Sequence, residues 1–82
     1  MLRFKLRELI AEKSFNEDRH ITIVEVANAC NVNRMTLSKM VNKKGYNTNS
    51  ENIDKLCTYF ECRVEDLVEH LADDLAFEIK LK

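Results

Sequence analysis

The run ANACNVNRMTLSKM, residues 27–40, is the feature that most restricts how this chain can fold. The chain has no proline and one glycine, so few positions force a helix to end. The helical pattern nevertheless breaks at Cys30-Asn31-Val32, where Asn31 tolerates the left-handed backbone conformation better than most residues other than glycine. We therefore predict two short helices separated by a sharp turn.

Polar residues mark the beginning of both helices. Thr22 can accept a hydrogen bond from a free backbone N–H, and Glu25, three residues later, completes a capping box. Asn33 can cap the next helix in the same way. The inner face of that helix would carry Leu37, Met40 and Val41. Two short helices joined by a tight turn make a helix-turn-helix, which we place at about residues 22–42.

The rest of the chain also has the spacing of amphipathic helices. A first helix is predicted over residues 4–13, and loops over residues 14–20 and 43–47. A capping box from Thr48 and Glu51 would open a fourth helix, and residues 64–71 would form a fifth. The apolar positions are Leu2, Leu6, Leu9 and Ile10, then Ile53, Leu56, Cys57 and Phe60, then Val64, Leu67, Val68 and Leu71. We predict one all-α domain of five helices over residues 1–82.

Both ends of the chain alternate apolar and polar residues. In the extension over residues 73–82, Leu75, Phe77, Ile79 and Leu81 alternate with polar or small residues, which is typical of a half-buried strand. Residues 2–6 alternate in the same way. A short C-terminal strand is therefore favoured, paired with residues 2–5 or with a second subunit, although the same apolar residues also fit a continuing helix.

Positive charge is concentrated in the middle of the chain. Residues 26–50 have a net charge of +4 with no acidic residue, whereas residues 51–82 have a net charge of −5. A local cluster of this kind favours a phosphate-bearing partner. The alternative is a solvated loop with lysines at helix ends.

Several classes of protein are excluded or disfavoured. A chain of 82 residues has little core to spare for a deep cleft, and it has no glycine-rich phosphate loop or nucleophile motif, so we expect no enzyme. Three cysteines argue against a disulfide framework, and their spacing with His70 matches no ordinary zinc pattern. No secretory signal or membrane span is recognised. We expect a cytoplasmic protein without metal, cofactor, membrane or small-molecule substrate.

The outer face of the helix over residues 33–42 has the chemistry of a groove-reading helix. Its candidates for base contact are Arg34, Met35, Thr36, Ser38 and Lys39. Arginine and lysine donate to guanine O6 and N7, serine and threonine to several bases, and methionine can contact a thymine methyl. An exposed methionine also suits a protein interface, so Met35 is ambiguous.

From these residues the chain resembles the phage repressor and Cro type of helix-turn-helix protein, the XRE family, in its short form. The resemblance covers about residues 4–71 and rests on Val26-Ala27, Asn31-Val32-Asn33, Leu37-Ser38, residues 42–45 and the run IDKLCTYFECRVEDLVEHL. It places Arg34, Met35, Ser38 and Lys39 at base edges. It places Thr22, Asn33, Asn42, Lys43, Lys44 and, less directly, Tyr46 near phosphates.

Three positions depart from the family pattern. Asn31 stands where the family usually has glycine, Ile23 where a DNA-contacting glutamine often opens the second helix, and Asn33 where serine or threonine is common.

The resemblance implies a sequence-specific regulator of transcription, a repressor, that inserts the helix over residues 33–42 in the major groove of double-stranded DNA. Few base contacts per domain imply a homodimer on two half-sites about one helical turn apart. The alternative is a protein-interaction module, such as an antitoxin or anti-repressor partner, on the same scaffold. Ile23 and the acidic C-terminal half favour that alternative.

Overall fold

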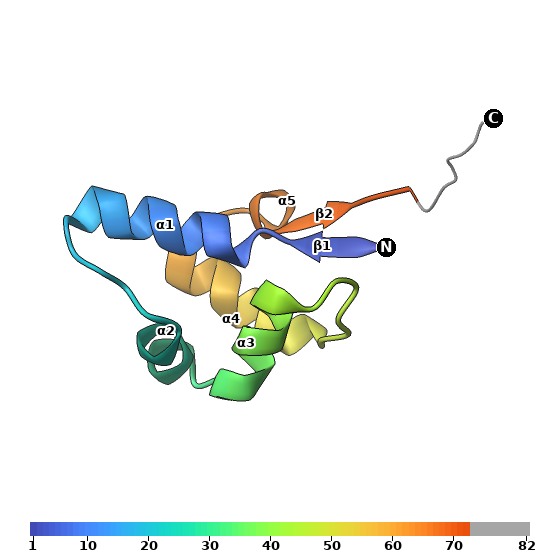
Figure 1. Ribbon diagram of the computed structural model, residues 1–82, viewed down its shortest axis with the longest axis horizontal. Helices are drawn as coiled ribbons and strands as arrows, with labels where there is room; N and C mark the ends of the chain where they lie inside the picture. The colour runs from blue at the N-terminus through green and yellow to red at the C-terminus, as the bar shows by residue number, and fades with distance from the viewer. Residues whose placement is uncertain (73–82) are drawn as a thin grey trace.

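A computed structural model describes residues 1–72 of the chain, which form five helices and two short strands (Figure 1). The elements are β1 (Leu2–Phe4), α1 (Leu6–Glu17), α2 (Ile23–Cys30), α3 (Arg34–Asn42), α4 (Ser50–Phe60), α5 (Val64–Leu67) and β2 (Val68–His70). In Figure 1, α1 runs along the top, α2 and α3 lie below it, and the strand pair extends to the right. The expected five-helix architecture is confirmed.

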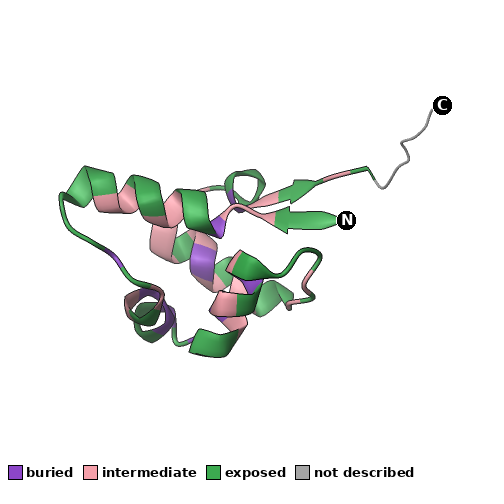
Figure 2. Cartoon of the chain, viewed as in Figure 1, coloured by how far each residue is buried: buried purple, intermediate pink, exposed green. Residues whose placement is uncertain are grey.

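One hydrophobic core joins all the helices. Its fully buried side chains come from every helix and from the loop before α2: Leu6, Ile21, Val26, Leu37, Leu56 and Leu67. Figure 2 shows the buried residues on the inward sides of the helices. Burying each such side chain contributes roughly 1.5–3 kcal/mol relative to leaving it exposed, so the helices are held mainly by this shared core.

The turn between α2 and α3 has the geometry expected from the sequence. Asn31 is left-handed, with φ 56° and ψ 46°, and the Val32 N–H donates to the Ala27 carbonyl over 3.0 Å. The Asn31 carbonyl in turn accepts from Lys55 Nζ of α4 over 3.4 Å. The turn is therefore fixed both by its own backbone bonds and by a neighbouring helix.

Both caps of the helix-turn-helix are confirmed. Thr22 Oγ1 accepts from the Glu25 N–H over 3.1 Å, and Asn33 Oδ1 accepts from the Met35 N–H over 2.7 Å. These bonds satisfy N–H groups that have no partner inside the helix. The two helices therefore begin where the polar residues predicted.

The predicted bounds of the first helix were wrong at both ends. Phe4 belongs to β1 instead, because its backbone pairs with Val68 of β2, and the helix begins at Leu6. At the other end the helix continues to Glu17 and closes on the left-handed Asp18 (φ 54°). The last turn buries little, with Phe15 85% exposed, so apolar spacing could not reveal it.

The fourth helix begins one residue later than its predicted capping box. Its N-cap is Asn49, whose Oδ1 accepts from the Asn52 N–H over 2.8 Å. Thr48 Oγ1 instead accepts from the Asn52 side-chain amide over 3.1 Å. Two adjacent polar residues offered equivalent caps, and asparagine takes the position at the helix start.

The predicted fifth helix over residues 64–71 was also too long. It ends at Leu67, and β2 pairs antiparallel with β1 in the register Leu2↔His70 and Phe4↔Val68. The Lys5 N–H donates to the Leu67 carbonyl over 2.7 Å, so the N-terminal segment draws this stretch into a ribbon. The N-terminal residues thus pair with residues 68–70, and the strand predicted over residues 73–82 lies outside the described part of the chain.

Candidate nucleic-acid interface

One side of helix α3 is buried against the core, and the other side is exposed. Leu37 and Met40 are 0% and 2% exposed, and Val41 is half-buried, as expected for the inner face. Of the five candidates for base contact, Arg34, Met35 and Lys39 are exposed, whereas Thr36 and Ser38 are half-buried. The helix therefore offers a long, partly basic outer surface with its apolar back fixed in the core.

The N-termini of α2 and α3 both have side chains that can still donate hydrogen bonds. Thr22 uses its oxygen to cap α2, so its hydroxyl hydrogen remains available. Asn33 uses Oδ1 to cap α3, so its NH₂ group remains available. Free N–H groups and the positive end of the helix dipole at these termini favour anions such as phosphate.

The loop after α3 adds positive charge beside the same helix. Lys43 and Lys44 are both exposed, and the turn is completed by Gly45 with φ +66°. Tyr46 is half-buried, and Lys39 Nζ lies 6.0 Å from the centroid of its ring. This distance is at the outer limit of a cation–π contact, and it brings Lys39 of α3 close to the loop.

The one acidic side chain within α2 is held by an arginine. Arg19 contacts Glu25 through two bonds, Nη1 to Oε1 over 2.9 Å and Nη2 to Oε2 over 2.6 Å. Hydrogen bonding from Arg19 lowers the pKa of the Glu25 carboxyl, and the same contact raises the pKa of Arg19. The paired carboxylate adds little repulsion for an anion at the start of α2.

A comparison with models of protein families identifies the family of this chain. A family model for the Cro/C1-type helix-turn-helix DNA-binding domain matches residues 5–73, most of the chain. The chain belongs to this family. A comparison with curated proteins found no match. The expected family is thus confirmed, and the chain is a DNA-binding domain.

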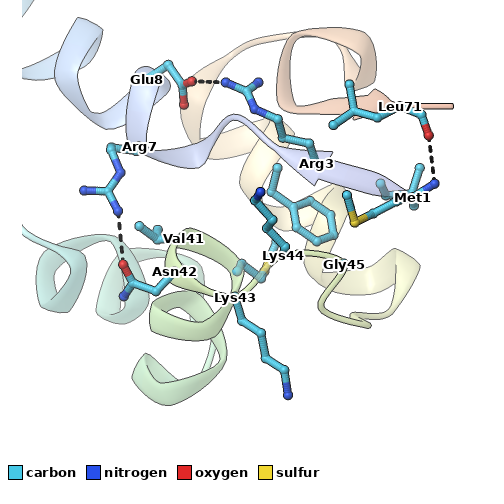
Figure 3. Close-up of a pocket in the computed structure, with 13 residues that line it drawn as sticks. Met1, Arg3, Arg7, Glu8, Val41, Asn42, Lys43, Lys44, Gly45 and Leu71 are labelled. Atoms are coloured by element: carbon cyan, nitrogen blue, oxygen red, sulfur yellow. Dashed lines mark hydrogen bonds and ion pairs between the residues drawn. The ribbon is translucent and has the colours of Figure 1, made fainter. Parts of the chain in front are cut away.

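One residue of this Cro/C1-type domain was missed by sequence reasoning. Arg7 of α1 donates from Nη2 to Asn42 Oδ1 over 3.0 Å, which links the first helix to the end of α3 (Figure 3). Arg7 is exposed and makes no ion pair with any residue in the described range 1–72. Its separation of 35 positions from Asn42 left no local signal; only its place off the apolar stripe of α1 could have drawn attention to it.

A groove of about 320 Å³ lies next to this link, between the strand pair and the loop after α3 (Figure 3). Its residues include Met1, Leu2, Arg3, Phe4, Arg7, Glu8, Met40, Val41, Asn42, Lys43, Lys44, Gly45 and Leu71. Arg3 is paired with Glu8, and with Glu69 over 2.8 Å, so it holds the ribbon to α1. The positive charge that remains along the groove comes from Arg7, Lys43 and Lys44.

The cysteines of the Cro/C1-type domain lie in or near its core. Cys30 is buried, and burial raises the pKa of its thiol. Cys62 is half-buried, and burial together with nearby Cys57 raises its thiol pKa to about 11. Within residues 1–72, no three histidine, cysteine, aspartate or glutamate side chains gather where they could hold a metal ion. No helix in that part of the chain is long and apolar enough to cross a membrane.

Proposed function

We propose that this domain is a sequence-specific regulator of transcription, acting as a repressor, that inserts α3 in the major groove of double-stranded DNA. The observation that carries the proposal is the outer face of α3, where basic side chains are exposed while Leu37 and Met40 hold the opposite side in the core. Residues 26–50 carry no acidic residue that would oppose the approach of DNA.

Base edges are contacted by α3 in this proposal. Arg34 and Lys39 donate to guanine O6 and N7, and Met35, 58% exposed, packs on a thymine methyl. Thr36 and Ser38, which are half-buried, complete the set of proposed base contacts.

Phosphates are contacted by groups that flank α3. Thr22 and Asn33 donate from the two helix N-termini, and Asn42, Lys43 and Lys44 donate from the end of α3 and its loop. Tyr46, half-buried in the loop after Lys44, can add a hydrogen bond from its hydroxyl. The phosphate contacts fix the register of the protein, and the base contacts supply its specificity.

A homodimer completes the proposed function. One domain places few side chains on base edges, so high specificity needs two copies on half-sites about 34 Å apart, one turn of the double helix. Binding of the dimer over a promoter would exclude polymerase, which gives repression.

Selection from a random pool of duplex DNA at two salt concentrations tests the proposal. We expect a palindromic consensus and a steep fall in retention with salt, because phosphate contacts release counterions. If the pool is not retained even at low salt, the proposal is wrong.

A protein-interaction module is the second candidate. Ile23 occupies the start of α2, where a side chain that donates to DNA would be useful, and Val24 and Phe15 are 47% and 85% exposed. Exposed apolar side chains, among them Met35 on α3, suit a protein partner. Absence of DNA binding, together with capture of a defined protein that protects Met35 and Val24 from labelling, would favour this candidate.

A further inference from the structure

Three side chains form a hydrogen-bonded chain from the first helix to the outer side of α3. Arg7 Nη2 donates to Asn42 Oδ1 over 3.0 Å, drawn as a dashed line in Figure 3. Asn42 Nδ2 then donates to Ser38 Oγ over 3.4 Å. This series of hydrogen bonds ends at Ser38, one of the proposed base contacts, whereas Arg7 lies on a different helix.

The guanidinium of Arg7 sets the direction of both hydrogen bonds. A guanidinium has only donors, so the Asn42 amide must turn its oxygen to Arg7. The NH₂ group of Asn42 therefore faces Ser38, and because NH₂ can only donate, Ser38 Oγ must accept. Arginine stays protonated at any ordinary pH, so this direction does not reverse.

The hydroxyl hydrogen of Ser38 is then left for another acceptor. Among the described residues it donates to none, whereas Thr58 Oγ1 in α4 donates to the Asp54 carbonyl one turn back, over 3.0 Å. That back-bond is the usual use of a hydroxyl inside a helix. Ser38 differs because its oxygen is already engaged and its hydrogen is not.

We propose that Arg7 is a positioning residue for DNA reading: through Asn42 it fixes Ser38 as a hydrogen-bond donor toward an acceptor on a base edge. This inference rests on the proposed function. In the major groove the acceptors are guanine O6 and N7, adenine N7 and thymine O4. Because Asn42 occupies one of the two acceptor sites of Ser38 Oγ and the hydroxyl hydrogen is left over, these groups are favoured over the amino groups of cytosine and adenine.

The first test uses the free protein and is independent of DNA. In ¹⁵N-labelled protein the side-chain NH₂ signals of Asn42 should shift in Arg7→Met and in Ser38→Ala, because each removes a bond to the amide. Arg3→Met removes the same charge from a neighbouring residue outside the chain of bonds, and should leave those signals in place. Unchanged Asn42 signals in Arg7→Met would overturn the inference whatever the protein does with DNA.

The second test uses the consensus selected by the wild-type protein. In Asn42→Asp a carboxylate accepts from both Arg7 and Ser38, so the Ser38 hydroxyl turns inward and no longer donates to a base. We expect a three- to tenfold loss of preference at one base position, about the worth of one hydrogen bond, matching the loss in Ser38→Ala. Arg7→Met, which has no donor, should weaken the same position, and Arg7→Lys, which keeps a donor, should restore most of it.

Asn47→Asp is the matched control for the added negative charge, since Asn47 is exposed in the loop that follows α3 and lies outside the chain of bonds. It should weaken binding to all sequences about equally. A uniform loss in Asn42→Asp can come from its own phosphate contact, so the deciding observation is base preference. If neither Asn42→Asp nor Ser38→Ala changes the preference at any base position, the proposed base reading by Ser38 is wrong. If the wild-type protein retains no DNA, the role in reading falls with the proposed function, and the Asn42 signals still decide whether Arg7 orients the amide.

Discussion

Replacing Glu61 with glycine should stabilise the fold, because Glu61 occupies a backbone conformation that favours glycine. Its φ and ψ are 52° and 50°, and its N–H closes the end of α4 on the Thr58 carbonyl over 3.2 Å. An L-residue in this region carries a cost of roughly 1–2 kcal/mol, and glycine avoids it. Glycine loses about 0.5–1 kcal/mol more conformational entropy on folding, so the net gain is about 0.5–1 kcal/mol.

The control for this prediction is Glu61→Ala. The Glu61 side chain forms no hydrogen bond or ion pair with another residue in the range 1–72, although its charge raises the pKa of Lys13 from a distance. A carboxylate at a helix C-terminus is also unfavourable, and both substitutions remove it equally. The difference between the two variants therefore isolates the backbone contribution.

Urea unfolding and thermal melting measure the difference directly. Glycine should exceed alanine by about 0.5–1 kcal/mol in free energy of unfolding, which corresponds to roughly 2–8 °C in Tm for a domain of this size. Equal stability of the two variants would refute the assignment of a backbone cost to this position. DNA binding should be unchanged in both, since Glu61 lies at the end of α4 rather than on α3.

Four further predictions concern the interface and the core. Arg34→Ala should weaken binding to the selected site by about 1–3 kcal/mol, the worth of a bidentate base contact, and unchanged affinity would contradict that role. Lys43→Ala should weaken all sequences alike in filter binding and flatten the salt slope by about one unit; a sequence-selective loss would argue against a phosphate contact. Leu37→Ala should lower the free energy of unfolding by about 2–5 kcal/mol in urea melts, because its side chain is fully buried, and a smaller loss would mean that the site collapses around the cavity. Because Arg19 holds the folded pKa of Glu25 below its ordinary value of 4.5, this pair stabilises the fold above that pH and the contribution disappears as the pH falls through the folded pKa; Glu25→Gln should flatten this acid-side dependence in melts from pH 3 to 7, and an unchanged profile would contradict the pairing.

Much of the candidate site was predictable because its signals act over a few residues. The capping residues Thr22 and Asn33 bond to N–H groups two or three positions away, so their role follows from the local sequence. The exposed face of α3 follows from helical spacing once Leu37 and Met40 are taken as buried. The assignment of individual side chains to bases or phosphates stays a prediction.

The parts of the candidate site that the sequence did not predict depend on contacts between residues far apart in the chain. Nothing near Arg7 in the chain indicates Asn42 as its partner, and only the packing of α1 against α3 brings the two side chains together. The donor role of Ser38 could not be predicted for the same reason. A hydroxyl can donate or accept, and its neighbours in the fold decide which it does.

The sequence by itself determined the helix-turn-helix, its caps and the left-handed turn at Asn31, because short-range sterics and hydrogen bonds act within one or two turns of helix. Only the tertiary structure decided the ends of the chain. Residues 2–4 and 68–70 have ambiguous local patterns, and each became a strand because the other supplied its backbone partner across the fold. A strand, unlike a helix, cannot satisfy its own backbone, so its existence depends on a distant segment that local sequence does not identify.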